Sequence, residues 1–263
     1  MFWFFSARKK VERMIRALPV ADIIGNKAGP VLLVTAGLDG DEYAGIEAAY
    51  AAAEKYSDGN FSGRLIILPL VNMPGFEAGV SHNPLDGKFP KYCIPGQAHG
   101  SPTERLMQHI VQTYARTAVL WLDLHSGALG EITTSCIWSS TTGIAAVDAR
   151  GKHYARVSGA PVAVCTPAHT GIRILAPYGC TYVLAESEDT TQHSIYIERA
   201  MQQLGMLPGN PPEHTMRIFT KTRDTYSQTE EIRNDELLLW YKTAPPTRQG
   251  ERVGEIAYDE KKY

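Results

Sequence analysis

The sequence of 263 residues predicts a three-layer α/β domain with a mixed, largely parallel sheet, followed by a small, mostly β appendage. Short apolar runs alternate with helix-like segments, as they do in sheets that have helices on both faces. Residues 118–124 are nearly all apolar, which is typical of a strand covered on both sides. This alternation ends near residue 208, where Pro and Gly cluster. We therefore predict an α/β domain over residues 1–207 and an appendage over residues 208–263.

The predicted strands are short apolar runs: residues 31–36, 64–70, 118–124, 134–139, 162–165 and 182–185, with 237–241 and 253–258 in the appendage. The predicted helices are residues 42–55, 101–116 and 194–204. The second helix has the clearest start, because Ser101 can cap it, Pro102 suits its first turn and Glu104 completes a capping box. Residues 72–100 are rich in Gly and Pro without periodicity, so we expect an ordered loop over the sheet edge.

Composition excludes several classes of protein. Charged residues make up 21% of the chain and the formal net charge is −2, so the net charge provides no general electrostatic attraction to nucleic acid or anionic lipid. No segment approaches the roughly 20 apolar residues that span a bilayer. The four cysteines are widely spaced, without a CxxC pair. We therefore expect a cytoplasmic protein without a disulfide framework, and the sequence leaves open whether it forms a homo-oligomer.

The first candidate metal ligands are Asp39 and Glu42, between the first long strand and an Ala-rich helix. Residues three apart lie on one side of a helical turn, so the two carboxylates could hold one cation. The alternative is that both acids only cap the helix and oppose its dipole, which requires no metal.

The third candidate ligand is His125, at the end of the apolar strand 118–124 and before a Ser-Gly turn. A single His at such a position is more often a hydrogen-bonded core residue. Two carboxylates and one imidazole nevertheless form a reasonable zinc site with a fourth position for water. Asp123 suits a supporting role beside His125, or its side chain points into the sheet.

Glu186 ends another apolar strand and is the candidate general base. If its strand runs parallel to that of His125, both residues stand at the same carboxyl edge of the sheet. A carboxylate there could take a proton from water and return it to a leaving amine. The alternative of a solvated acid at a strand end fits Glu188, two residues later, better than it fits Glu186.

Together these segments resemble the succinylglutamate desuccinylase/aspartoacylase family, relatives of the zinc carboxypeptidases. The resemblance rests on six ordered blocks that include GDEYAGIE at 40–47 and DLHSG at 123–127; the others are 29–37, 72–79, 83–88 and 100–105. It covers about residues 17–205, with a fainter match at 249–256. It implies a zinc carboxypeptidase-like fold, metal ligands at Asp39, Glu42 and His125, and Glu186 as general base.

This chain departs from the family pattern at the first metal ligand, because Asp39 stands where the family's HxxE motif has His. Aspartate also ligates zinc, so the change does not abolish the site. It adds negative charge, which also suits harder cations such as Mn²⁺. We expect one Zn²⁺ per chain, with Mn²⁺ as the second choice.

The second departure concerns substrate binding. Lys91 and Tyr92 occupy the positions where the family usually has an Asn-Arg pair. Lysine attracts a carboxylate but lacks the two-pronged guanidinium, so the usual acidic N-acyl amino acid is in doubt as the substrate. Arg173, between two glycines, is the candidate replacement for anion binding, with a surface salt bridge as the alternative.

The resulting prediction is a zinc-dependent amidohydrolase that cleaves a C–N amide bond in a small N-acylated compound. Two altered positions in the expected site keep a second hypothesis open, a non-catalytic descendant that binds a ligand or partner. A carboxypeptidase-like peptidase ranks third, since the missing Arg weakens recognition of a terminal carboxylate.

Overall fold

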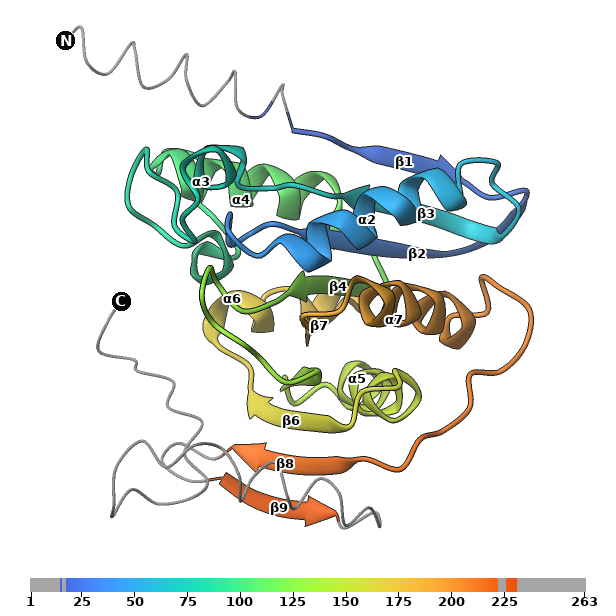
Figure 1. The fold of residues 1–263 in the computed structure, drawn as a ribbon. Coiled ribbons are helices and arrows are strands. Elements are labelled where there is room, and N and C mark those ends of the chain that lie inside the picture. Colours follow the sequence, from blue (N-terminus) through green and yellow to red (C-terminus); the bar gives the residue numbers. More distant parts are fainter. Residues whose placement is uncertain (1–14, 16–17, 222–225, 231–263) are drawn as a thin grey trace, which may run out of the picture.

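A computed structural model describes residues 15, 18–221 and 226–230, in which one nine-stranded sheet lies between two helical layers (Figure 1). The strand order is β1-β3-β2-β4-β7-β5-β6-β8-β9. The strands are β1 (Ala21–Ile24), β2 (Lys27–Ala36), β3 (Ser62–Leu68), β4 (Leu120–His125), β5 (Cys136–Thr141), β6 (Val162–Pro167), β7 (Thr181–Glu186), β8 (Arg217–Lys221) and β9 (Tyr226–Glu230).

The sheet consists of two blocks of opposite direction. Strands β3, β2, β4 and β7 run parallel to one another. Strand β5 is antiparallel to β7, and β6 and β8 run parallel to β5. The edge strands β1 and β9 are each antiparallel to their neighbour. The predicted mixed, largely parallel sheet is confirmed.

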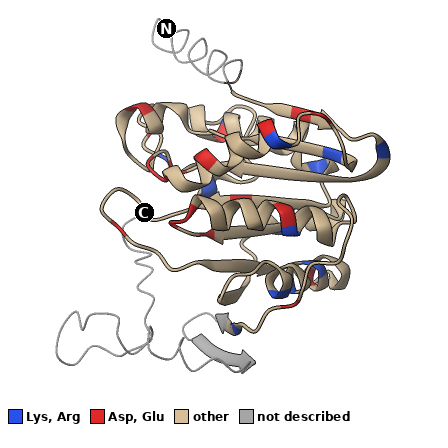
Figure 2. Ribbon diagram, turned by 45° about the vertical axis from the view of Figure 1, so that its right-hand side comes forward, with Lys and Arg blue, Asp and Glu red and all other residues tan. Residues whose placement is uncertain are grey.

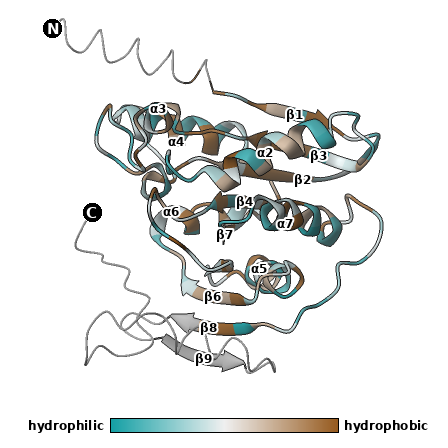
Figure 3. Cartoon of the chain, viewed as in Figure 1, coloured by the Kyte–Doolittle hydropathy of each residue, from teal (hydrophilic) through white to brown (hydrophobic). Residues whose placement is uncertain are grey.

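Two helical layers complete the sandwich. Helices α2 (Tyr43–Lys55), α5 (Ala145–Val157) and α7 (Thr190–Gln203) pack on one face around a core that includes Ile46, Tyr154 and Tyr196. The other face carries α4 (Pro102–Thr113) and α6 (Thr170–Arg173), which enclose a second core with Trp121 and Leu106. Hydrophobic residues therefore concentrate in the strands and on the inner sides of the helices (Figure 3).

The shorter elements are α3 (Met73–Ala78) and the 3₁₀ turns Pro90–Cys93, Ala115–Thr117 and Ala176–Tyr178. Two of them lie within residues 72–100, so the prediction of one long loop there is wrong in part. The capping box that Ser101 and Glu104 predict at the start of α4 is present. Charged residues of both signs are interspersed over the helices (Figure 2).

The boundary of the predicted appendage remains a prediction, because most of residues 208–263 lie outside the described ranges, including the predicted strands 237–241 and 253–258. The described part shows that β8 extends the main sheet by pairing with β6. Across the described residues, no helix is both long and apolar enough to cross a membrane.

Candidate metal centre

Three parallel strands bring the candidate residues to one edge of the sheet. His125 is the last residue of β4, Glu186 is the last residue of β7, and the two are direct register partners. Asp39 follows the end of the neighbouring strand β2. Parallel strands place their carboxyl ends together, which is why residues far apart in the sequence converge here.

Two glycines shape the turn that carries Asp39. Gly37 has a φ of 62°, a left-handed conformation that favours glycine. A Cβ atom on Gly40 would lie 2.3 Å from the backbone of Gly75 and Phe76, so α3 can approach this turn only because Gly40 has no side chain. The close approach leaves Asp39 only 1% exposed.

Glu42 is the N-cap residue of α2, yet its side chain makes no capping hydrogen bond. Its Oε2 instead accepts a hydrogen bond from the backbone N–H of Ser126 at 3.0 Å and lies 2.7 Å from Nδ1 of His125. The carboxylate therefore turns away from the helix end and into the centre, which disfavours the interpretation that it only caps the helix.

His125 is held from its other side by Asp123. His125 Nε2 lies 3.1 Å from Asp123 Oδ2, which also accepts a hydrogen bond from the Tyr182 hydroxyl at 2.6 Å. Asp123 Oδ1 accepts one from Thr35 Oγ1 at 2.6 Å, and Thr35 in turn accepts one from Trp121 Nε1. With its Nε2 proton directed at Asp123, the imidazole presents Nδ1 to Asp39 and Glu42.

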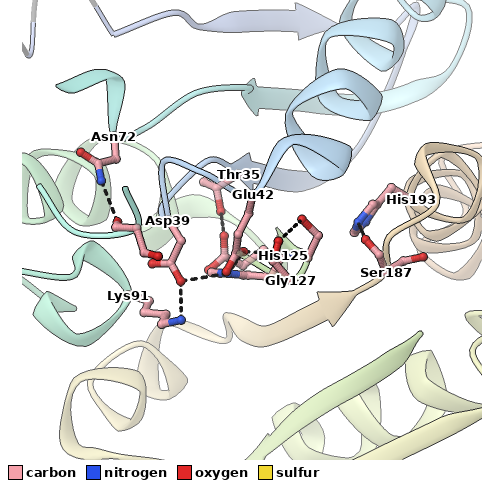
Figure 4. Close-up of polar contacts among 12 residues, drawn as sticks. Thr35, Asp39, Glu42, Asn72, Lys91, His125, Gly127, Ser187 and His193 are labelled. Carbon is pink, nitrogen blue, oxygen red and sulfur yellow. Dashed lines mark hydrogen bonds and ion pairs between the residues drawn. The ribbon is translucent and has the colours of Figure 1, made fainter. Parts of the chain in front are cut away.

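The arrangement of Asp39, Glu42 and His125 fits a metal ion. One ligand atom from each of these three buried residues lies within 4.8 Å of the others (Figure 4). Asp39 Oδ1 is buried and has no hydrogen-bond partner among the described residues, so it retains a lone pair for a cation. The donor set of two carboxylates and one imidazole suits zinc and also harder divalent ions.

Lys91 forms an ion pair with Asp39 through Nζ and Oδ2. The two residues that depart from the family pattern therefore contact each other. Among the described residues, Lys91 is the one Lys or Arg side chain that forms an ion pair with any of the three candidate ligands, and its partner is Asp39.

Burial dominates the electrostatics of this centre. It raises the pKa of Glu42 to about 8 and that of Glu186 to about 7, although the charges of His125 and Lys91 oppose the rise. Burial lowers the pKa of His125, but the carboxylates of Glu42 and Asp123 outweigh it and hold this pKa well above its ordinary value. A buried cluster that is this rich in carboxylates favours a bound cation.

Lys91, Tyr92 and Glu186 line a cavity of about 440 Å³ beside the candidate metal centre. Arg173, at the end of α6, is exposed and is not among the residues that line it. The structure thus brings two of the three predicted substrate-binding residues to the cavity and leaves Arg173 outside it.

Several residues of the site escaped the sequence analysis. Glu188 is no simple solvated acid, because Oε1 accepts hydrogen bonds from the backbone N–H groups of Gly127 and Thr133 at 2.7 and 2.9 Å. It ties the loop before β5 to the end of β7. Its position two residues after Glu186 was the only available signal, and the partners are backbone groups that no side-chain pattern reveals.

His193 is also buried, and its Nε2 contacts the backbone oxygen of Ser187 at 2.9 Å. Burial lowers the pKa of His193 to about 4, so the ring is neutral and supports the turn after β7. The Ser187 N–H donates to the backbone oxygen of His125 at 3.0 Å, which connects this support to the metal centre.

Comparison with known proteins agrees with this geometry. Residues 28–206 match the succinylglutamate desuccinylase/aspartoacylase catalytic domain. Over 110 residues the chain is 34% identical to an N-alpha-acetyl-L-2,4-diaminobutyric acid deacetylase from Halomonas elongata; this covers 42% of the chain and 32% of that protein. The matched stretch thus spans about a third of the length of this curated relative.

Two solved structures share the fold. A succinylglutamate desuccinylase/aspartoacylase from Rhodobacter sphaeroides has a TM-score of 0.71 at 23% identity, over 79% of this chain and 66% of that one. The product-bound ectoine utilization protein EutE (DoeB) from Ruegeria pomeroyi has a TM-score of 0.67 at 25% identity, over 79% and 67%. The family consists of metal-dependent deacylases. This chain belongs to the succinylglutamate desuccinylase/aspartoacylase family.

Proposed function

We propose that this protein is a zinc-dependent amidohydrolase that cleaves the C–N amide bond of a small N-acylated compound. Asp39, Glu42 and His125 hold the metal and Glu186 is the general base. The observation that carries the proposal is the convergence of three buried ligand atoms within 4.8 Å beside Glu186, the register partner of His125. The deacetylase relative, whose named substrate is a small N-acetylated compound, supports this substrate class.

A bound divalent cation would polarise the amide carbonyl and make the attacking water more acidic. The protein's own residues supply the remaining functions. Asp123 orients His125 so that Nδ1 faces Asp39 and Glu42. Lys91 and Tyr92 line the cavity and orient the substrate. We leave Arg173 out of the binding set because it is exposed and lies outside the cavity lining.

Glu186 moves the proton. Its carboxylate accepts a proton from the attacking water and returns it to the nitrogen of the leaving amine. A pKa near 7 suits this exchange at neutral pH, because the group is then available in both protonation states. Burial of the side chain is the cause of that value, so the same sheet edge that positions Glu186 also tunes it.

The test of the metal site is the metal content of the purified protein and of the Asp39→Asn variant. We expect one zinc ion per chain and its loss in the variant. Asp58→Asn is the matched control, because Asp58 is exposed on the loop before β3. Absence of stoichiometric metal after loading with zinc and with manganese would refute the site.

The test of the base is turnover of N-acetylated amino acids by Glu186→Gln. General-base catalysis contributes about 10²–10⁴-fold, so the variant should lose at least about a hundredfold in kcat while still binding metal. Glu131→Gln, a matched change in another carboxylate of the cavity lining, should stay within a few-fold.

One observation favours a second function, a non-catalytic member that binds a ligand. The ion pair of Lys91 with Asp39 already supplies one positive charge to a candidate ligand. Under this hypothesis N-acyl compounds bind without turnover, and Glu186→Gln changes neither binding nor rate.

A further inference from the structure

The floor of the cavity is a regular patch of three neighbouring strands. Successive side chains of a strand point to opposite faces, so alternate residues share a face. Nine such residues from β7, β5 and β6 line the cavity: Tyr182, Leu184, Glu186, Cys136, Trp138, Ser140, Val162, Val164 and Thr166. The candidate base is therefore one corner of a continuous surface that extends away from the metal centre.

The register of the strands orders this surface into rows. Glu186 lies opposite Cys136, which lies opposite Val162. In the next row, Leu184 lies opposite Trp138, which lies opposite Val164. Two residues along a strand span roughly 6–7 Å, so this apolar row begins one step from the Glu186 carboxylate. A substrate with its amide at Glu186 would place its adjoining group over this row.

The walls of the cavity are also unsuited to an anionic group. Tyr92 and Ile172 add apolar surface, while Glu131 adds a second acid to the Glu186 of the floor. Lys91 is the one Lys or Arg side chain among the described lining residues, and it already pairs with Asp39. A substrate carboxylate would lose its hydration here, and it would have to compete with Asp39 for Lys91, the one Lys or Arg among the described lining residues.

We propose that the substrate carries an uncharged hydrocarbon or aromatic group beside its amide, and that this group binds over Leu184 and Trp138, the partly exposed residues of this row, which ends at the buried Val164. The inference rests on the proposed amidohydrolase function and names the substrate class for the same site. The volume of about 440 Å³ falls within the range of small-molecule sites and exceeds what an acetyl group alone would fill.

Two series of amides test the proposal with the metal-loaded protein. One series lengthens the acyl group from acetyl through butanoyl to hexanoyl on a constant amine, and the other lengthens the amine on a constant acetyl group. We expect kcat/KM to rise by about fourfold per methylene in one series, the increment of burying a CH₂ group. Flat profiles in both series, or a preference for N-acetylaspartate over every neutral amide, would overturn the proposal.

Leu184→Thr identifies the surface that contacts the added carbon atoms, because it replaces apolar side-chain surface in the partly exposed part of the row with a smaller, hydroxyl-bearing side chain. It should reduce the rise per methylene, whereas Ile174→Thr, which alters an exposed residue just past α6, should not. A lowered Tm of Leu184→Thr with an unchanged profile would show that the added carbon atoms do not contact this row, and would overturn the assignment.

Binding separates this inference from the proposed function. Titration calorimetry of the longest and shortest amides is carried out on Glu186→Gln. If the native protein turns over no amide but the longer amides bind more tightly, the hydrolase proposal fails and the apolar subsite stands. If amides are hydrolysed but binding is independent of length, the subsite fails alone.

Discussion

The hydroxyl of Tyr182 provides a sharp test of how His125 is oriented. It donates to Asp123 Oδ2 at 2.6 Å, and the same oxygen lies 3.1 Å from His125 Nε2. Burial raises the pKa of Tyr182 well above its ordinary value, so the hydroxyl remains a donor at any working pH. Tyr182→Phe removes this donor and keeps the ring, which packs edge-on against Trp121 at a centroid distance of 5.2 Å.

The expected cost follows from the partner's charge and burial. A hydrogen bond to a charged group contributes about 1.5–3 kcal/mol, and Asp123 is fully buried. Asp123 retains Thr35 and His125 as partners, so we expect a loss of about 2 kcal/mol in the free energy of unfolding. For a domain of this size that loss lowers Tm by about 4–8 °C.

Urea denaturation and calorimetry of the metal-free protein measure this loss. Tyr50→Phe on the exposed side of α2 is the matched control and should change the free energy of unfolding by less than about 0.5 kcal/mol. In the metal-loaded protein we also expect weaker zinc binding, by up to about tenfold, because supports of a ligating His tune metal affinity. A loss below about 0.5 kcal/mol with unchanged zinc affinity would refute the orienting role of this network.

Three further predictions concern the same centre. Lys91→Met should lower the Tm of the metal-free protein and strengthen zinc binding by about tenfold or more, because it removes a positive charge paired with Asp39; weaker binding in a chelator competition would contradict this. The metal-free protein should lose stability as pH rises from 5 to 8: the pKa of Glu42 (about 8) and that of Glu186 (about 7) lie above their unfolded values, so the folded state binds more protons. The midpoints of urea denaturation at pH 6 and pH 8 test this prediction, and the midpoint at pH 8 should be the lower one. Gly40→Ala should displace α3 and lower Tm. Gly87→Ala is the comparison variant: a Cβ there meets no atom within 4 Å, so any change in Tm reflects only the backbone strain of a positive φ.

The central strands could be predicted from sequence because each is a short apolar run that ends in polar residues. Strand β4 is buried on both faces and β7 on most of its length, so each apolar run is continuous and its end is visible at His125 or Glu186. The two strands pair in parallel, so both ends lie at the same edge of the sheet. The convergence of Asp39, Glu42 and His125 is therefore a consequence of the fold that the sequence predicts.

Other features depend on pairings that the sequence does not display. Helix α5 was not predicted, because Ala145–Val157 contains Gly151 at its centre and only three large apolar residues, Val147, Tyr154 and Val157. The reversed direction of β5 depends on where the chain re-enters the sheet after residue 126. The contacts of Lys91 with Asp39 and of Tyr182 with Asp123 join positions 52 and 59 residues apart. No local pattern reveals such contacts.

The strands change direction between β7 and β5, and the residues expected to do the chemistry and those expected to contact the substrate come from different sides of this change. The candidate metal ligands and the base come from the ends of β2, β4 and β7, whereas most of the cavity floor comes from β5 and β6, which run the other way. The loop that leads into β5 reaches the cavity rim and is tied to the first part by Glu188 and by the contact of Ser135 Oγ with Ser187 Oγ at 2.9 Å. Exchange of residues 128–141 between relatives should therefore change the substrate preference and leave the metal ligands in place. This segment is a suitable target for engineering, and a region in which relatives can diverge in specificity.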